Sequence, residues 1–280
     1  MSTPLKILKK YGIRPTRSLG QSFLIDNNIT AKIVDSAGIE KNDTVVEVGA
    51  GPGMMTRCIA DKAGEVIALE IDSRIVEVLR QELGALPNVH IVETDVLAFD
   101  FSSTAACRRI KVIGNIPYNI SSQILFRLIE YRQAIASVTL MFQREVAERI
   151  MAPPGSKGYG ILSVITMMYM LPSKVMTVPA SCFYPKPKVE SMVLTMDVRE
   201  RPLCEGCDYE IFRKVVRSAF AKRRKTLINS LKESAFIRDL DINLAVILGD
   251  LGIDATRRGE TLSVEEFGRL SRAIEAAIIR

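Results

Sequence analysis

The sequence of 280 residues has a single histidine, no tryptophan and no apolar run of membrane-spanning length. With only His90 available, the chain cannot build a histidine-dependent catalytic triad or a metal centre with two histidine ligands. The most apolar stretch, residues 159–171, is shorter than the roughly 20 residues that cross a bilayer, so we expect it in a protein core. Because the first residues lack a signal-peptide core, we expect a cytoplasmic protein.

Cysteine is also scarce, and its distribution argues against both disulfides and metal. The five cysteines are scattered and odd in number, which does not fit a disulfide framework. Cys204-Glu205-Gly206-Cys207 has the spacing of a metal knuckle, but no second pair lies nearby. Structural zinc requires four ligands, so we expect no metal.

Basic residues are concentrated in two short segments. Residues 1–20 and 213–225 contain no acids and contribute +5 and +7, which leaves the rest of the chain at −6 within a net charge of +6. A charge run is often only a solvated helix face. Two such clusters on an otherwise acidic chain are also typical of a polyanion-binding surface.

The hydrophobic pattern predicts an α/β fold followed by a helical tail. Apolar strand-like runs alternate with helical segments such as 73–83 and 122–131, which indicates an open, mostly parallel sheet covered by helices. After residue 200 the periodicity becomes helical, and Ser263 is an expected N-cap. We therefore divide the chain into a domain of residues 1–200, which begins with the basic arm 1–20, and a helical domain of residues 201–280. The predicted strands are 44–48, 65–69, 89–93, 110–114, 136–142 and 191–198, and the predicted tail helices are 209–220, 243–251 and 264–279.

A glycine-rich turn follows the first predicted strand. Thr44-Val45-Val46-Glu47-Val48 leads directly into Gly49-Ala50-Gly51-Pro52-Gly53 and then into a helical pattern. Glycines in such a turn let the backbone bend tightly and approach a ligand closely. The spacing differs from the dinucleotide fingerprint, because the third glycine comes one residue early, and no Gly-Lys-Ser/Thr follows to grip phosphates.

Single acids end the next two predicted strands. Glu70 follows the run 65–69, and Asp95 follows the run 89–94. Each alone is more often a solvated strand end. Their recurrence at the sheet edge where open α/β folds bind ligands favours a role in holding a ribose and an adenine.

Asn115-Ile116-Pro117-Tyr118, directly after the run 111–114, is the most informative motif. An amine on a nucleobase ring is a poor nucleophile because its lone pair is delocalised. The Asn side-chain carbonyl and the next backbone carbonyl can accept its two hydrogens, and the Tyr ring can stack on the base. By itself the tetrapeptide could equally be a strand-ending turn.

These segments together resemble the S-adenosylmethionine-dependent ribosomal RNA adenine dimethyltransferases that modify small-subunit rRNA, whose sheet is of the Rossmann-like class I methyltransferase type. The likeness extends nearly from end to end. It includes residues 19–24, 49–53, 115–118, 142–149, 183–189 and 219–227. One departure is Ser22, where the family usually has Asn; its hydroxyl can still donate or accept a hydrogen bond, but with a shorter reach.

The resemblance implies a role for each matching position. It implies binding of S-adenosylmethionine, with S-adenosylhomocysteine as product, by Ser22, Leu24, Gly49, Gly51, Glu70, Asp95 and Asn115. It implies catalysis by Asn115, Pro117, Tyr118 and Phe183, with Tyr118 and Phe183 sandwiching a flipped adenine. Without the resemblance, Phe183 is better read as a core aromatic beside a rigid connector. RNA contact is expected from Arg217, Lys222, Arg223, Arg224 and Lys225.

The expected activity is dimethylation at N6 of two adjacent adenosines in the 3′-terminal hairpin of small-subunit rRNA, within an immature ribosomal small subunit, by a monomer. The pocket must then admit an amine that already carries one methyl, and Gly114 is a small neighbour that could give room. Three alternatives stay open: a large-subunit rRNA methyltransferase of the antibiotic-resistance type, a DNA adenine methyltransferase, and a ribosome-assembly factor in which methylation is secondary. The DNA enzymes more often have a second proline where Ile116 stands.

Overall fold

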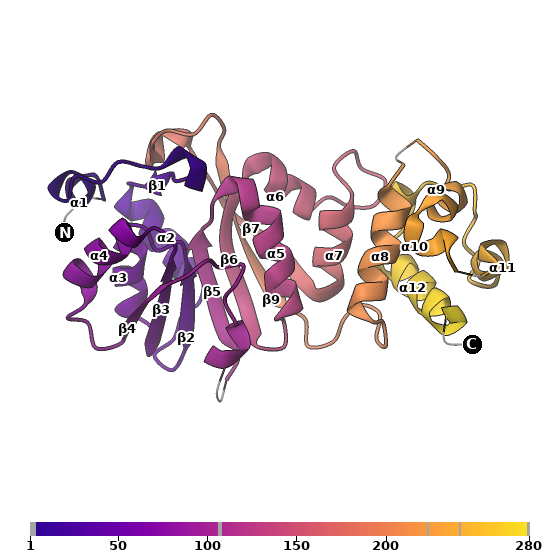
Figure 1. Ribbon diagram of the computed structural model, residues 1–280, viewed down its shortest axis with the longest axis horizontal. Helices are drawn as coiled ribbons and strands as arrows, with labels where there is room; N and C mark the ends of the chain where they lie inside the picture. The colour runs from indigo at the N-terminus through magenta and orange to yellow at the C-terminus, as the bar shows by residue number, and fades with distance from the viewer. Residues whose placement is uncertain (1–3, 106–107, 223, 241, 279–280) are drawn as a thin grey trace. The chain divides into compact units, whose positions relative to one another are not determined.

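The computed structural model describes residues 4–105, 108–222, 224–240 and 242–278 (Figure 1). The chain forms two compact units. The first comprises Met1–Ala147 and Pro172–Val198, and the second comprises Glu148–Leu171 and Arg199–Arg280. The chain passes from the first unit to the second at residues 198–199, close to the expected boundary at residue 200. The segment 148–171, however, belongs to the unit of the C-terminal helices and not to that of the sheet.

The first unit contains a seven-stranded sheet, within the part of the chain that the structure describes, in the order β4-β3-β2-β5-β6-β9-β7. The strands β2 to β6 pair in parallel, whereas β9 runs antiparallel to β6. The strands are β2 (Thr44–Val48), β3 (Glu65–Glu70), β4 (Val89–Glu93), β5 (Ile110–Asn115), β6 (Ile135–Gln143), β7 (Met170–Val178) and β9 (Ser191–Val198). All six strands expected from the sequence are present.

Strand β7 was not expected, because Pro172, Ser173 and Lys174 interrupt its apolar pattern. It occupies an edge of the sheet. An edge strand tolerates proline and polar side chains because one row of its backbone groups has no neighbouring strand.

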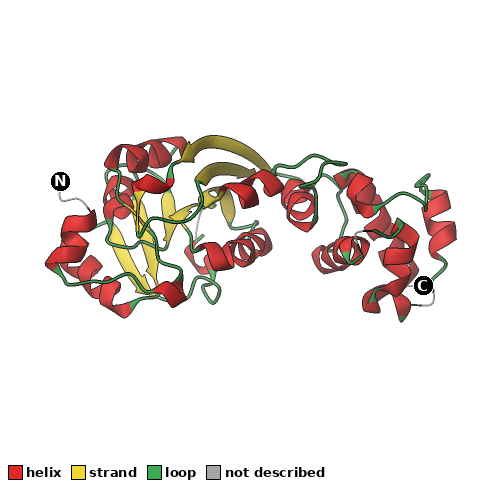
Figure 2. Cartoon of the chain, turned by 90° about the horizontal axis from the view of Figure 1, so that it is seen from above, coloured by secondary structure: helices red, strands yellow, loops and turns green. Residues whose placement is uncertain are grey.

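Helices cover both faces of the sheet, as the red and yellow elements of Figure 2 show. α2 (Asn27–Ser36) and α3 (Met54–Ala60) pack on one face through residues such as Ile33 and Ile59. α4 (Ser73–Leu83) packs on the other through its apolar stripe, which includes Ile75, Leu79 and Leu83. This stripe follows the 3.6-residue period from which the helix was predicted. α5 (Ser121–Glu130) begins one residue before its expected start.

The chain before the sheet folds back onto it. α1 (Pro4–Lys10) packs through Ile7 against Met54 and Val78. The strand β1 (Phe23–Leu24) then pairs antiparallel with β8 (Phe183–Tyr184), a segment 160 positions later in the chain. This short ribbon brings the arm and the proline-containing segment after β8 together.

The second unit is helical over its described residues. Its helices are α7 (Ile161–Tyr169), α8 (Tyr209–Phe220), α9 (Leu227–Glu233), α10 (Ala235–Arg238), α11 (Leu244–Asp250) and α12 (Val264–Ile278), and α6 (Arg144–Ile150) crosses from the first unit into the second. Ser263 caps α12 as expected: the Glu266 amide donates to its hydroxyl at 3.2 Å, and Glu266 Oε2 accepts from the Ser263 amide at 2.7 Å. Phe212, Phe267 and Leu270 are fully buried between these helices.

Candidate active site

A cavity of about 240 Å³ opens in the first unit at the carboxyl ends of β2, β3, β4 and β5. The strand order reverses between β2 and β5, which is the switch point where open α/β sheets bind ligands. The cavity is lined by Ser18 to Phe23, Val48, Gly49, Gly51, Leu69 to Ile71, Thr94 to Leu97 and Asn115 to Ile120.

The glycine turn forms one wall of this cavity. Gly49 and Gly51 have φ angles of 73° and 54°, in the left-handed region that favours glycine. A Cβ on Gly51 would lie 3.1 Å from the ring of Phe23, a tight contact that adds to the strain of a positive φ at this position. The third glycine, Gly53, has a different role, because its Cβ would lie 2.7 Å from Leu83 of α4. It therefore permits close helix packing and does not line the cavity.

Glu70 joins the glycine turn to the end of β3. Its Oε2 accepts from the Gly51 amide at 3.0 Å, and its Oε1 accepts from the amides of Ile71 and Asp72 at 2.9 and 3.0 Å. Burial raises the pKa of Glu70, and these backbone donors oppose the rise. The carboxylate is thus fixed at the cavity wall with acceptor capacity left for a ligand hydroxyl. Asp95, the second predicted acid, also lines the cavity and is exposed.

Asn115 stands at the end of β5, between the glycine turn and the arm. Its Nδ2 donates to the backbone carbonyl of Ser22 at 2.8 Å. This bond fixes the orientation of the amide and leaves Oδ1 as an acceptor. The predicted proximity of Asn115 to the glycine-lined cavity is therefore present in the structure.

The residues after Asn115 are held in place as well. Pro117 and Tyr118 line the cavity, and the Tyr118 hydroxyl lies 2.5 Å from the Ser191 hydroxyl of β9. Burial raises the pKa of the Tyr118 phenol. Gly114 does not provide room at the amine, because its Cβ would lie 2.4 Å from the Val48 carbonyl oxygen, and its small size instead allows β5 to approach β2.

Two predicted site residues do not line the main cavity. Leu24 and Phe183 are 7% and 3% exposed and pack together in the core on the α2 and α3 face of the sheet. Leu24 borders a smaller neighbouring cavity of about 30 Å³, and Phe183 borders neither. Side chains on a strand alternate between faces, so the pairing of β1 with β8 turns Leu24 and Phe183 inward together. Phe183 thus occupies a core position, and the structure does not bring its ring to the cavity.

Ser22 lines the cavity, but its hydroxyl is already engaged. It donates to the carbonyl of Pro185 at 2.9 Å and so ties the arm to the segment after β8. Its backbone carbonyl accepts the hydrogen bond from the Asn115 amide.

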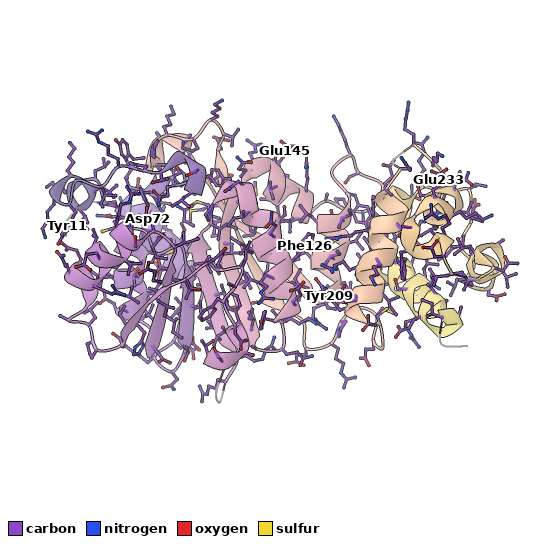
Figure 3. All side chains as sticks on the ribbon, in the orientation of Figure 1. Tyr11, Asp72, Phe126, Glu145, Tyr209 and Glu233 are labelled. Atoms are coloured by element: carbon purple, nitrogen blue, oxygen red, sulfur yellow. The ribbon has the colours of Figure 1, made fainter. Side chains whose placement is uncertain are left out.

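Sequence reasoning missed a polar network that holds the arm over the cavity. Gln21 donates to Asp72 Oδ2 at 2.9 Å, and its own oxygen accepts from the Thr16 amide at 2.8 Å. Arg74 Nε donates to Asp72 Oδ1 at 2.9 Å and, by this contact, lowers the pKa of Asp72. Figure 3 labels Asp72, which lies close to the arm in that view. The only available sequence signal was an Asp two residues after Glu70, at the cap of a predicted helix.

Glu47 of β2 was also missed as a candidate. It is 1% exposed, borders the smaller cavity with Asn115, and its Oε2 has no hydrogen-bond partner among the described residues. Burial raises the pKa of this carboxyl to about 8. The side chain is therefore largely uncharged at neutral pH.

The predicted RNA-binding residues lie in the second unit. Arg217, Lys222, Arg224 and Lys225 are exposed, and Lys225 pairs with Glu233. Arg223 lies outside the described residues.

The amino-acid sequence matches the profile of a known protein family. The profile of the family described as ribosomal RNA adenine dimethylase matches residues 13–269. The chain belongs to the ribosomal RNA adenine dimethylase family. Ribosomal RNA small subunit methyltransferase A of Shouchella clausii is 44% identical over 286 residues, which cover 99% of this chain and 97% of that protein. The protein of the same name from Alkaliphilus oremlandii is 40% identical and covers 97% of this chain and 96% of its own length.

Solved structures agree with the placement in this dimethylase family. A dimethyladenosine transferase from Plasmodium falciparum superposes with a TM-score of 0.77 at 27% identity, over 90% of this chain and 97% of that one. The 23S rRNA methyltransferase ErmE superposes with a TM-score of 0.68, also at 27% identity, over 90% and 99%. The dimethylase is thus an α/β methyltransferase of the S-adenosylmethionine-dependent class.

Among the described residues, no cluster of three or more His, Cys, Asp or Glu side chains is suited to a metal ion. None of the described helices combines the length and apolar character needed to cross a membrane.

Proposed function

We propose that this dimethylase transfers methyl groups from S-adenosylmethionine to N6 of two adjacent adenosines in the 3′-terminal hairpin of small-subunit rRNA. The observation that carries the proposal is the end-to-end similarity, at 40–44% identity, to proteins named small subunit methyltransferase A. The substrate is the hairpin within an immature small subunit in the cytoplasm, the enzyme acts as a monomer, and the modification belongs to ribosome biogenesis.

The cavity residues fit the cofactor. Gly49 and Gly51 form the cavity wall without side chains, and the positive φ of both residues favours glycine there. Glu70, held by backbone donors, accepts from the ribose hydroxyls, and Asp95, two residues beyond β4, accepts from the adenine amine. Ser22, which follows the arm, closes the cavity wall beside Asn115, and Leu24 acts from the core by holding β1 in position. When bound, the cofactor supplies an electrophilic methyl group on a sulfonium.

The Asn115 side chain carries the catalytic role. The bond from Nδ2 to Ser22 prevents the side-chain amide from rotating, so Oδ1 is available to accept one N6 hydrogen. The backbone carbonyl that follows accepts the other N6 hydrogen. The two acceptors favour a pyramidal amine whose lone pair points at the methyl group of the cofactor. The rate is thus raised by positioning and electrostatic stabilisation. Pro117 fixes the turn, and Tyr118, anchored through Ser191, stacks on the extruded base.

Phe183 supports this site from behind. Its ring packs with Leu24 under the β1–β8 ribbon, so it positions the arm residues that line the cavity. No metal takes part in the proposed reaction, and the exposed Arg217, Lys222, Arg224 and Lys225 of the second unit bind RNA phosphates, together with Arg223.

A side-by-side methylation assay tests the proposal. Unmethylated small subunits, large subunits and duplex DNA are each incubated with the enzyme and radiolabelled S-adenosylmethionine, and the RNA is then digested and analysed for dimethyladenosine. We expect label only in the small subunit, at two adjacent adenosines. Label in the large subunit or in DNA would replace the proposal with one of the other methyltransferase activities, and growth supported by an inactive variant that still binds subunits would favour an assembly factor.

A further inference from the structure

The segment Tyr184–Val189, here called the rim segment, does not line the active-site cavity itself but is bonded to residues that do. Its Pro185 carbonyl accepts from the hydroxyl of Ser22, a residue of the cavity wall, at 2.9 Å. Just beyond its other end, the Ser191 hydroxyl lies 2.5 Å from the hydroxyl of Tyr118, on another wall. Figure 1 shows this salmon-coloured stretch beside β1. The rim segment is therefore anchored to the cavity at both ends.

The side chains of the rim segment face solvent. Tyr184 is 45% exposed and Val189 is 44% exposed. Lys186 and Lys188 are exposed, and neither has an ion-pair partner among the described residues. The nearest acid along the chain, Glu190, is paired with Arg144 at 3.0 Å. The rim segment thus presents one aromatic ring and two positive charges.

The direction of the Tyr184 ring follows from strand pairing. Tyr184 lies directly opposite Phe23 in the antiparallel β1–β8 ribbon, so both side chains are on one face. Phe23 lines the cavity and packs in the core with Leu79 and Leu83, whereas Leu24 and Phe183 pack in the core on the other face of the sheet. Tyr184 is the exposed aromatic on the Phe23 face of the ribbon, and its own ring lies outside the cavity lining.

We propose that the rim segment binds the RNA strand next to the methylated adenine, with Tyr184 stacked on the neighbouring base and Lys186 and Lys188 on its phosphates. The inference rests on the proposed function. Extrusion of one adenine leaves the adjacent base without a stacking partner, and an aromatic side chain can replace that partner whatever the sequence. In a substrate with two adjacent adenosines, the base on Tyr184 is the second methylation target.

The sequence of the rim segment suits this role. Pro185 and Pro187 restrict φ at two of its six positions, so little backbone freedom remains to be lost when RNA binds. Lysine contacts phosphate as a point charge. Such contacts position the RNA strand but do not distinguish one base sequence from another.

The test uses the full-length protein and unmethylated small subunits. We expect Tyr184→Ala to raise the KM for subunits about five- to 150-fold, which is the range for loss of one stacked base. Tyr184→Phe should restore the KM, because the ring is retained. The double variant Lys186→Ala with Lys188→Ala should lower the slope of log binding constant against log salt by about 1.4, as expected for two contacts to single-stranded phosphate. Calorimetric affinity for S-adenosylmethionine should stay unchanged in all three.

Lys32→Ala, an exposed lysine of α2, is the matched control and should behave as wild type. A KM within twofold of wild type for Tyr184→Ala, or an unchanged salt slope for the double variant, overturns the inference. If instead the wild-type protein fails to methylate small subunits, the proposed function fails first, so the two failures are distinguishable.

Discussion

The buried carboxyl of Glu47 makes stability depend on pH in a way that can be measured. Its pKa is raised from 4.5 to about 8 by burial, with Oε2 lacking a hydrogen-bond partner among the described residues. Between these values the folded protein keeps a proton that the unfolded chain releases. The contribution of Glu47 to the free energy of unfolding therefore falls as pH rises, by up to about 1.4 kcal/mol per pH unit. From pH 5 to pH 8 the loss from this residue is on the order of 3 to 4 kcal/mol.

Glu47→Gln removes the titrating group and keeps the shape. Urea unfolding of variant and wild type, followed by circular dichroism at pH 5, 6, 7 and 8, should show the variant gaining relative stability by that amount across the range. A constant offset from the amide does not affect this slope. Glu77→Gln, on the exposed side of α4, is the control and should follow the wild type. Parallel pH profiles for Glu47→Gln and wild type would refute the reasoning.

Three further predictions concern the site and the RNA. Asn115→Ala should lower the single-turnover rate of methyl transfer on the order of 10²- to 10³-fold, as for loss of one preorganised polar group, whereas the exposed Asn28→Ala should not. Gln21→Ala should weaken S-adenosylmethionine binding about tenfold in calorimetry, because the arm loses a hydrogen bond to the Asp72 carboxylate. Lys222→Ala should weaken subunit binding and lower the salt slope by about 0.7 to 0.9, measured by filter binding.

Each of these predictions has a contrary result. Near-normal turnover by Asn115→Ala would remove the proposed clamp on the amine. Unchanged cofactor affinity in Gln21→Ala would show that the hydrogen bond between Gln21 and Asp72 is not needed to hold this segment at the cavity. An unaltered salt slope in Lys222→Ala would mean that this exposed lysine makes no phosphate contact.

Much of the fold could be predicted because its elements depend on local patterns. The strands β2, β3 and β5 are buried β-branched or apolar runs, and α4 has a regular apolar stripe. β7 could not be predicted, because an edge strand with Pro172 carries no such pattern. The assignment of 148–171 to the second unit also depends on packing between distant helices.

For the site, the sequence identified which positions end the strands but not how their side chains are engaged. Glu70, Asp95 and Asn115 were found because the carboxyl ends of neighbouring parallel strands share one edge of the sheet. The bond between Gln21 and Asp72 joins residues 51 positions apart and left no local pattern. The engagement of the Ser22 hydroxyl by Pro185 was equally invisible.

The sequence by itself determined the α/β architecture, the glycine turn and the family, because these depend on residue types at short, fixed spacings. Only the tertiary structure decided that Phe183 faces the core while Tyr184 faces solvent, since that choice depends on how β8 pairs with a strand 160 positions earlier. Strand pairing sets which of two adjacent side chains is buried, and no local sequence pattern encodes it.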